Sequence, residues 1–122
     1  SYNDSASRFG RIVFQYNHSG NLLQFLIGTN SGSIGYEETT LTSNTWHHLA
    51  VSINGTSYEA YKDGVSVGTG TTDLLADASG ATTIGIYSVS NQFSWNGQIS
   101  KVKAYTNALT PEEINILYSE GF

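Results

Sequence analysis

Apolar and polar residues alternate over short runs along most of the chain, and turn-forming residues close each run. Because successive strand side chains point to opposite faces, this period predicts β-strands with one buried face. The clearest run is Trp46–Asn54, in which Leu49, Val51 and Ile53 share a face. The other predicted strands are Arg11–Tyr16, Asn21–Gly28, a weaker Ser33–Thr40, Ser57–Lys62, its return through Val65 and Val67, Ala81–Tyr87 and Gly97–Tyr105.

The residues between these runs predict the turns. Asn54-Gly55 and Asp63-Gly64 are typical of tight hairpin turns, because both central positions of a type I′ turn need a positive φ. Gly68–Gly80 is the longest turn-rich segment. Within Gly97–Tyr105 the apolar period slips by one residue, which predicts a β-bulge. The pattern as a whole predicts about eight or nine short strands.

Only the C-terminal end has a helical pattern. Thr110 followed by Pro111 and then Glu113 forms a capping box with proline at the first helical position. The helix is expected to end at Gly121. The chain is therefore predicted to be an all-β, antiparallel sandwich or jelly roll with one short C-terminal helix.

Length and composition exclude several classes of protein. The 122 residues are the size of one domain, with residues 1–10 expected as a tail or linker end and residues 11–122 as the domain. A net charge of −5 argues against a nucleic-acid partner. No apolar run is long enough to span a membrane. The lack of cysteine excludes disulfides, thiolate zinc sites and a cysteine nucleophile.

Five short segments, from Trp46–Val51 to the closing segment that ends with Glu113 and Ile114, resemble segments of laminin G-like domains of the concanavalin A-like lectin and glucanase superfamily. Trp46–Val51 resembles the "W-x-H-V-A" strand of this family. The remaining matches, in the family's order, are Tyr61–Gly64 to "Y-x-D-G", Ile84-Gly85 to "I-G", Phe93–Ile99 to "F-x-G-x-I", and Tyr105, Ala108, Leu109, Glu113 and Ile114 to the closing signature. The resemblance covers the chain from Arg11 to Phe122 and implies a concanavalin A-like sandwich.

The resemblance also implies that the family's first strands are missing. Members of the family begin with a strand pair before the segment that aligns with Arg11. Either the chain is part of a longer protein, or a neighbouring domain or subunit supplies those strands. Because an uncovered sheet edge is a pairing site, we expect an oligomer or contact with another segment.

The superfamily includes glycosidases, so we looked for paired carboxylates. Retaining hydrolysis needs two carboxyl groups about 5 Å apart. Glu37 and Glu38 are adjacent and point to opposite faces of a strand, Glu59 is alone on its strand, and Glu112 and Glu113 belong to the helix cap. We therefore predict that the chain is not an enzyme.

Three residues near the middle of the chain are expected to be structural. His47 and His48 are neighbours on a predicted strand, so they point apart and cannot share a metal ion. We expect one of them to be packed and the other exposed. Trp46 is expected to lie in the core.

A calcium site is one prediction from the resemblance, since related domains often hold Ca²⁺ at the rim of the sandwich. The loop with Asp73 and Asp77 offers two carboxylates beside hydroxyl groups, and Ca²⁺ prefers such oxygen ligands. A solvated loop without metal is the alternative. Asp63 is assigned to its hairpin turn.

A glycan site is predicted in the segment before the last strand. Sugars bind to an aromatic face with nearby amides and hydroxyls, and loops commonly carry such residues. The candidate ligand-binding residues are Tyr87, Asn91, Phe93, Trp95 and Asn96. The alternative is structural, with Phe93 in the core and Trp95 covering a sheet edge.

These features favour a non-catalytic carbohydrate-binding or adhesion module of an extracellular or virion-surface protein. The alternative is a structural or decoration subunit that mediates protein–protein assembly of a viral or phage particle or appendage without sugar binding. Its partners would be a glycan or other protein chains of an assembly.

Overall fold

The computed structural model describes residues 11–17, 20, 22–28, 35–72 and 96–121. One antiparallel sheet contains β1 (Arg11–Asn17), β2 (Leu22–Gly28) and β3 (Gly35–Thr40) in that order. A second antiparallel sheet contains β4 (Leu49–Asn54), β5 (Ser57–Lys62) and β6 (Val65–Thr71), again in chain order. This mostly β architecture confirms the predicted fold class.

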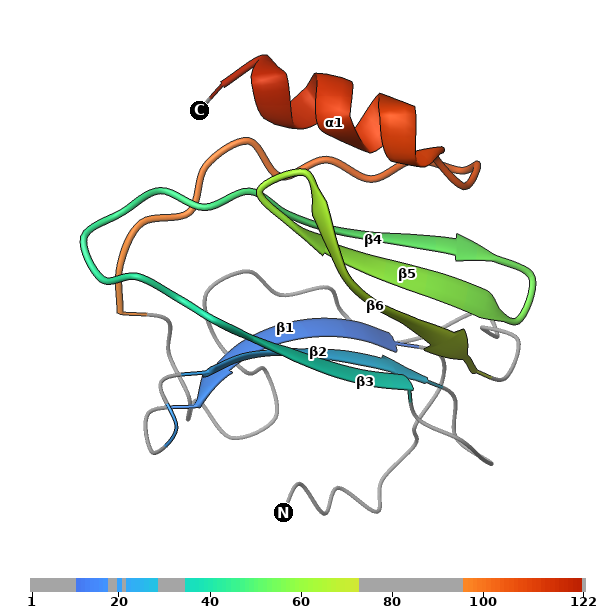
Figure 1. Cartoon of the computed structure of the whole chain (residues 1–122), viewed down its shortest axis with the longest axis horizontal. Helices are drawn as coiled ribbons and strands as arrows, with labels where there is room; N and C mark the ends of the chain where they lie inside the picture. The colour runs from blue at the N-terminus through green and yellow to red at the C-terminus, as the bar shows by residue number, and fades with distance from the viewer. Residues whose placement is uncertain (1–10, 18–19, 21, 29–34, 73–95, 122) are drawn as a thin grey trace.

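The two sheets form stacked layers, and α1 (Pro111–Ser119) lies over the outer side of the β4–β6 sheet (Figure 1). The link between β3 and β4 carries the chain from one sheet to the other. Within the described residues each sheet is a meander, so the strand pairings there are local in sequence.

The core lies between the two layers. Leu23, Phe25 and Ile27 alternate along β2 and are fully buried, as strand alternation requires. They pack against Tyr58 and Ala60 of β5. Half-buried side chains extend this cluster, namely Leu41, Leu49, Val51, Ile53 and Val67. The alternation of Leu49, Val51 and Ile53 thus has the predicted role.

Two glycines make room for Tyr58 of β5 between the sheets. A Cβ atom at Gly35 would overlap the Tyr58 ring, and one at Gly70 would lie 2.6 Å from its hydroxyl oxygen. The Tyr58 hydroxyl donates a hydrogen bond to Glu37 Oε1 over 2.9 Å. Burial and the Glu37 carboxylate raise the pKa of Tyr58 to about 12, so the hydroxyl stays a donor.

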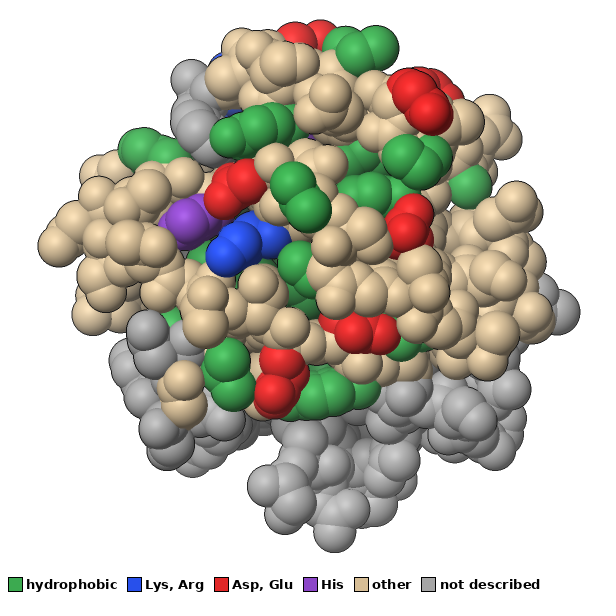
Figure 2. All heavy atoms as spheres, viewed as in Figure 1, with side chains coloured by type: hydrophobic (Ala, Val, Ile, Leu, Met, Phe, Trp, Pro, Cys, Tyr) green, Lys and Arg blue, Asp and Glu red, His purple; other side chains and the backbone are tan. Residues whose placement is uncertain are grey.

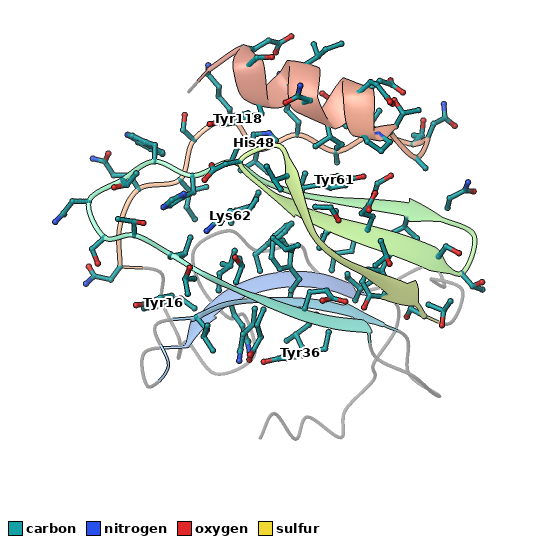
Figure 3. All side chains as sticks on the ribbon, viewed as in Figure 1. Tyr16, Tyr36, His48, Tyr61, Lys62 and Tyr118 are labelled. Atoms are coloured by element: carbon teal, nitrogen blue, oxygen red, sulfur yellow. The ribbon has the colours of Figure 1, made fainter. Side chains whose placement is uncertain are left out.

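Two further hydrogen bonds connect the layers. Lys62 donates from Nζ to the Thr40 carbonyl oxygen over 2.7 Å, and its side chain lies between the sheets (Figure 3). Thr72 donates from Oγ1 to the Ile27 carbonyl oxygen over 3.1 Å. These bonds lie between β3 and β5 and between β2 and the end of β6, so they hold the two meanders in one relative position.

The two predicted hairpin turns are present, with one correction. At Asp63-Gly64 both residues have positive φ, 52° and 78°, as a type I′ turn requires. At the other turn the two loop residues are Gly55 and Thr56, and only Gly55 has a positive φ, 62°. That arrangement is typical of type II′, so the prediction of a type I′ turn centred on Asn54-Gly55 was wrong.

The strand β6 is longer than predicted. Gly68 was assigned to the start of a turn-rich segment, yet β6 runs to Thr71. Its glycines serve close packing, because a Cβ at Gly68 would overlap the Glu37 carboxylate. A register shift in this strand pairs Ala60 with Gly68 and Tyr61 with Ser66, so β6 contains a bulge.

The strand β4 begins later than predicted. It starts at Leu49, and Trp46 therefore lies in the link between the sheets. Trp46 is 45% exposed, so its assignment to the core was wrong. His47 and His48 are both partly buried, which corrects the expectation that one of them would be exposed.

The predicted strand Gly97–Tyr105 does not form. Lys101 in its middle has a φ of 52°, a left-handed conformation that interrupts a pleat. Ile99, Val102 and Tyr105 are exposed instead of alternating into the core. The described residues thus contain six strands, while the predicted strand Ala81–Tyr87 lies outside the described residues.

The C-terminal helix confirms its prediction. Thr110 Oγ1 accepts from the Glu113 N–H and the Glu113 carboxylate accepts from the Thr110 N–H, which completes the capping box. Gly121 follows the helix with a φ of 82°. Ile114 faces the sheet and is buried. Over the ranges described, no helix is long and apolar enough to cross a bilayer.

The fit of Tyr58 predicts the effect of enlarging Gly35. Gly35→Ala should lower the free energy of unfolding by about 1–3 kcal/mol, because the ring must leave its position to admit a methyl group. Urea unfolding measures this loss. The matched control is Thr40→Ala on the outer face of the same strand, with an expected change within about 0.5 kcal/mol. Equal stabilities of the two variants would contradict the proposed packing.

Candidate functional site

The outer face of the β4–β6 sheet carries polar side chains in regular rows. Positions between the core residues of each strand point outward, away from the other sheet. Ser52 pairs with Glu59, which pairs with Thr69 on β6. Asn54 pairs with Ser57, which pairs with Thr71 to make the second row. The hairpin register therefore brings six polar side chains together.

Helix α1 covers the other end of this face. Tyr61, on the same face of β5, is buried and lies between the helix and the sheet (Figure 3). A Cβ at Gly64 would lie 2.9 Å from atoms of both Asn115 and Tyr118, so the helix rests directly on the β5–β6 turn. Among the described residues, none covers the end nearer the β4–β5 turn in this way.

The open end forms a shallow groove of about 420 Å³. We call it the hydroxyl groove and define it by Ser52, Asn54, Ser57, Glu59, Thr69 and Thr71, with Tyr61, Leu109 and Pro111 as its wall. Ser52 donates from Oγ to the Leu109 carbonyl oxygen over 2.8 Å, which holds the wall against β4. The groove thus combines hydroxyl, amide and carboxylate groups with an apolar border.

The Glu59 carboxylate is held in position within the groove. Its Oε2 accepts a hydrogen bond from Ser66 Oγ over 2.9 Å, and its Oε1 accepts one from the Tyr61 hydroxyl. Burial and the Glu59 carboxylate raise the pKa of Tyr61, so this hydroxyl remains a donor. Glu59 therefore presents an oriented acceptor at the edge of a half-buried surface.

A second cluster lies where the β3–β4 link meets the β5–β6 turn. Asp63 Oδ1 accepts from the His48 N–H over 2.8 Å, and the Asp63 N–H donates to the His48 carbonyl oxygen over 2.8 Å. The Thr42 N–H donates to His47 Nε2 over 3.2 Å, which leaves the proton on Nδ1 to bind Asp63 Oδ2 at 2.7 Å. The "W-x-H" and "Y-x-D-G" segments therefore meet through Asp63.

His48 occupies the other side of the same segment. Its ring lies 6.1 Å from the Tyr118 ring, centroid to centroid, beneath α1 (Figure 3). Its buried Nδ1 has no hydrogen-bond partner among the residues that the structure describes. Burial lowers the pKa of His48, Asp63 opposes this shift and Lys103 adds to it. The arrangement favours a neutral imidazole packed against the helix.

Of the predicted ligand and metal residues, the structure describes Asn96 alone. Tyr87, Asn91, Phe93 and Trp95 lie outside the described residues, and so do Asp73 and Asp77. Asn96 is described and exposed. Across the described ranges no group of three or more His, Asp or Glu side chains could hold a metal ion. Both site predictions therefore stay predictions.

The alternation along the strands already indicates the outward rows of the hydroxyl groove, which the predicted site residues do not include. If Leu49, Val51 and Ile53 face the core, then Ser52 and Asn54 must face outward. The hairpin register then places Glu59 beside Ser52, whereas Glu59 had been regarded as isolated. The position of the wall at Leu109 depends on where the helix packs, and the alternation along the strands does not predict that position.

Comparison with known families agrees with this architecture. Residues 2–115 match the laminin G-like model described as the concanavalin A-like lectin and glucanases superfamily. The chain belongs to this family. The resemblance identified from the five motifs is thereby confirmed, and the two stacked antiparallel sheets are those of a laminin G-like domain.

One solved structure similar to this laminin G-like domain is a segment (residues 221–444) of an S-layer domain-containing protein from Clostridium thermocellum. The sequence identity is 19% and the TM-score is 0.57. The alignment covers 97% of this chain and 67% of that one. No curated protein sequence matches the chain significantly. At this identity the likeness shows a shared fold.

The environment of His48 predicts how stability depends on pH. An unfolded histidine titrates near its ordinary pKa of 6.5, whereas the folded pKa is lower, so the unfolded state binds more protons below pH 6.5. Stability should therefore fall as the pH drops from about 7.5 to about 5.5. Urea unfolding at both pH values measures the difference.

The matched variant for this measurement is His48→Phe, which keeps a ring against Tyr118 and removes the titrating group. The other histidines are common to both proteins, so their contributions cancel. We expect a smaller loss of stability on acidification in the variant than in the original chain. An equal or larger loss would exclude His48 as a source of the pH dependence.

Proposed function

We propose that the chain is a non-catalytic carbohydrate-binding module of an extracellular or cell-surface protein, with the glycan bound in the hydroxyl groove. The observation that carries this proposal is the pair of cross-strand rows on the open end of the β4–β6 sheet. They supply hydroxyl, amide and carboxylate groups that line one groove of about 420 Å³. A site of this size suits a short saccharide.

The chemistry of the groove supports a sugar ligand. Each sugar hydroxyl both donates and accepts, so it pairs with Ser and Thr hydroxyls and with the Asn54 amide. Glu59 offers an acceptor that is oriented by two donors. Leu109 and Pro111 provide an apolar wall for the C–H face of a sugar ring.

The positions of the carboxylates support a role without catalysis. Glycosidases place two carboxyl groups on either side of one bound bond, about 5–9 Å apart. Glu37 points between the sheets toward Tyr58, whereas Glu59 lies on the outer face of the β4–β6 sheet. On the face drawn in Figure 2, acidic side chains are scattered over the surface. Glu37 and Glu59 thus lie on different sides of the β4–β6 sheet, which supports a role in binding.

The proposed setting is a cell or particle surface. The similar solved structure comes from a protein described as S-layer domain-containing, which supports a cell-surface location for this chain as well. The virion-surface setting inferred from composition remains the alternative within this proposal.

A second candidate function is assembly with other protein chains. The segment before the helix exposes Ile99, Val102 and Tyr105, and the helix exposes Ile116. Their exposed fractions are 45%, 62%, 51% and 59%. Several large apolar side chains on adjoining segments favour a protein contact. This candidate corresponds to a structural or decoration subunit.

Removing hydroxyls from the groove tests the first candidate. The double variant Thr69→Ala/Thr71→Ala should weaken glycan binding about thirtyfold, because two lost hydrogen bonds at about 1 kcal/mol each cost about 2 kcal/mol. A glycan array followed by calorimetry measures the change. Thr40→Ala/Thr42→Ala, at exposed positions outside the groove, is the control and should bind like the original chain. Equal binding by both variants would exclude the groove.

The same measurement separates the groove from the loop predicted earlier. Binding through the groove should survive a chelator and the substitution Trp95→Ala, provided that thermal stability is unchanged. Loss of binding with chelator would assign the ligand to a calcium site, for which Asp73 and Asp77 are the candidates. Loss with Trp95→Ala alone would assign the ligand to the aromatic loop.

Light scattering tests the assembly candidate. If the exposed apolar segment is an interface, the chain should be oligomeric, and Val102→Asp should shift it to monomers because a buried unpaired charge is costly. Ser100→Asp, a neighbouring exposed position, is the control. A chain that stays monomeric over the micromolar range would exclude this function for the isolated domain.

A further inference from the structure

We infer that the hydroxyl groove selects neutral glycans and discriminates against acidic ones, and that Glu59 is the residue that sets this specificity. The inference rests on the proposed function and names its ligand class. Neutral hexoses and N-acetylhexosamines belong to the favoured class, and uronic acids and sialic acids to the disfavoured class.

The charged side chains that the structure describes near the groove are negative. Glu59 lies in the groove itself. Glu112 follows Pro111 of the wall, and its charge acts together with that of Glu59 to raise the pKa of Tyr61. A carboxylate on a bound sugar would add a like charge beside Glu59, and such a juxtaposition is unfavourable.

The lysines that the structure describes interact with groups outside the groove. Lys62 points between the sheets to the Thr40 carbonyl oxygen. Lys101 donates to the Gly121 carbonyl oxygen over 3.1 Å, and Lys103 lies 3.8 Å from the Glu120 carboxylate, at the far end of α1 from the groove. None of these three cations lines the groove, so they cannot compensate an acidic ligand there.

The positive end of the helix does not supply the missing charge. Helix α1 begins at the groove wall, and a helix N-terminus favours anions. This one already holds its own carboxylate, since Glu113 accepts from the Thr110 N–H and Thr110 caps the Glu113 N–H. Glu112 adds a second acidic group in the first turn. These two acidic residues thus already offset the positive end of the helix dipole, which leaves little attraction for an acidic ligand.

Glu59 also explains why neutral sugars would bind well. Its oxygens are oriented by Tyr61 and Ser66, and each carboxylate oxygen can accept a further hydrogen bond. Sugar hydroxyls and acetamido N–H groups are donors that such an acceptor can take. A sugar carboxylate is an acceptor only, so it gains no bond from Glu59 and meets its charge.

The test compares matched ligands on one array. It uses neutral oligosaccharides together with the same oligosaccharides that end in a hexuronic acid or a sialic acid, at low ionic strength. We expect the original chain to prefer the neutral member of each pair by about fivefold or more, as like charges a few ångströms apart imply. The preference should shrink with added salt, because salt screens exposed charges.

Two variants locate the effect. Glu59→Gln keeps an oxygen acceptor for Tyr61 or Ser66 and removes the charge, so it should reduce the preference to about twofold or less at low salt. Glu38→Gln removes one charge on the outer face of the other sheet and should leave the preference unchanged. If Glu59→Gln fails to fold, the salt dependence in the original chain still tests the inference.

The outcomes separate this inference from the proposed function. Neutral glycans that bind no better than their acidic counterparts would overturn the selectivity while leaving carbohydrate binding intact. A preference that Glu59→Gln does not reduce would overturn the role of Glu59. Failure to bind any glycan would overturn the proposed function together with this inference.

Discussion

The turn at Asp63-Gly64 brings together three parts of the domain that are separate in sequence, namely the turn itself, the β3–β4 link and α1. Asp63 sits in a left-handed turn between β5 and β6, and its backbone and carboxylate bind both His48 and His47. This contact fixes the link from the other sheet against the turn. The neighbouring Gly64 then admits α1 at close range. The position of the groove wall therefore depends on a turn some distance from the groove.

In the β4–β6 sheet, side chains on one face build the core, and side chains on the other face support the helix or form the polar surface. Inward positions meet β2 and β3 and build the core, with glycines making room for Tyr58. Outward positions meet either the helix or solvent. Because Tyr61 is covered and Ser57 is open, one strand contributes to the support of the helix and to the polar surface at once. The register of the hairpins thus determines which side chains can act together on a ligand.

Local signals predicted most of the architecture, and their failures have physical causes. Alternation identified the described strands, the capping box identified the helix, and Asp63-Gly64 identified a turn. Glycine in β6 indicated a turn by composition, whereas it permits the approach of Glu37, a contact distant in sequence. The apolar residues of 97–105 suggested a strand, but Lys101 has a left-handed backbone, and Lys101 and Lys103 contact the end of α1.

The candidate site was harder to predict than the fold. Five of its six residues are ordinary Ser, Thr and Asn side chains, which carry no motif when read along the chain. They come together on one surface because the three strands pair in this register, and the segment that leads into α1 forms the border of that surface. Aromatic and acidic residues drew the prediction toward the segments that contain Trp95 and Asp73, because such residues have recognisable chemistry.

The outward rows have a consequence for how this domain can diversify. Four of the six groove side chains, Asn54, Ser57, Thr69 and Thr71, are exposed at the surface. Substitutions there change the chemistry of the open face while the buried alternation of β2, β4 and β5 continues to specify the scaffold. A family built on this plan can acquire new recognition properties through a handful of neighbouring codons without first evolving a new framework.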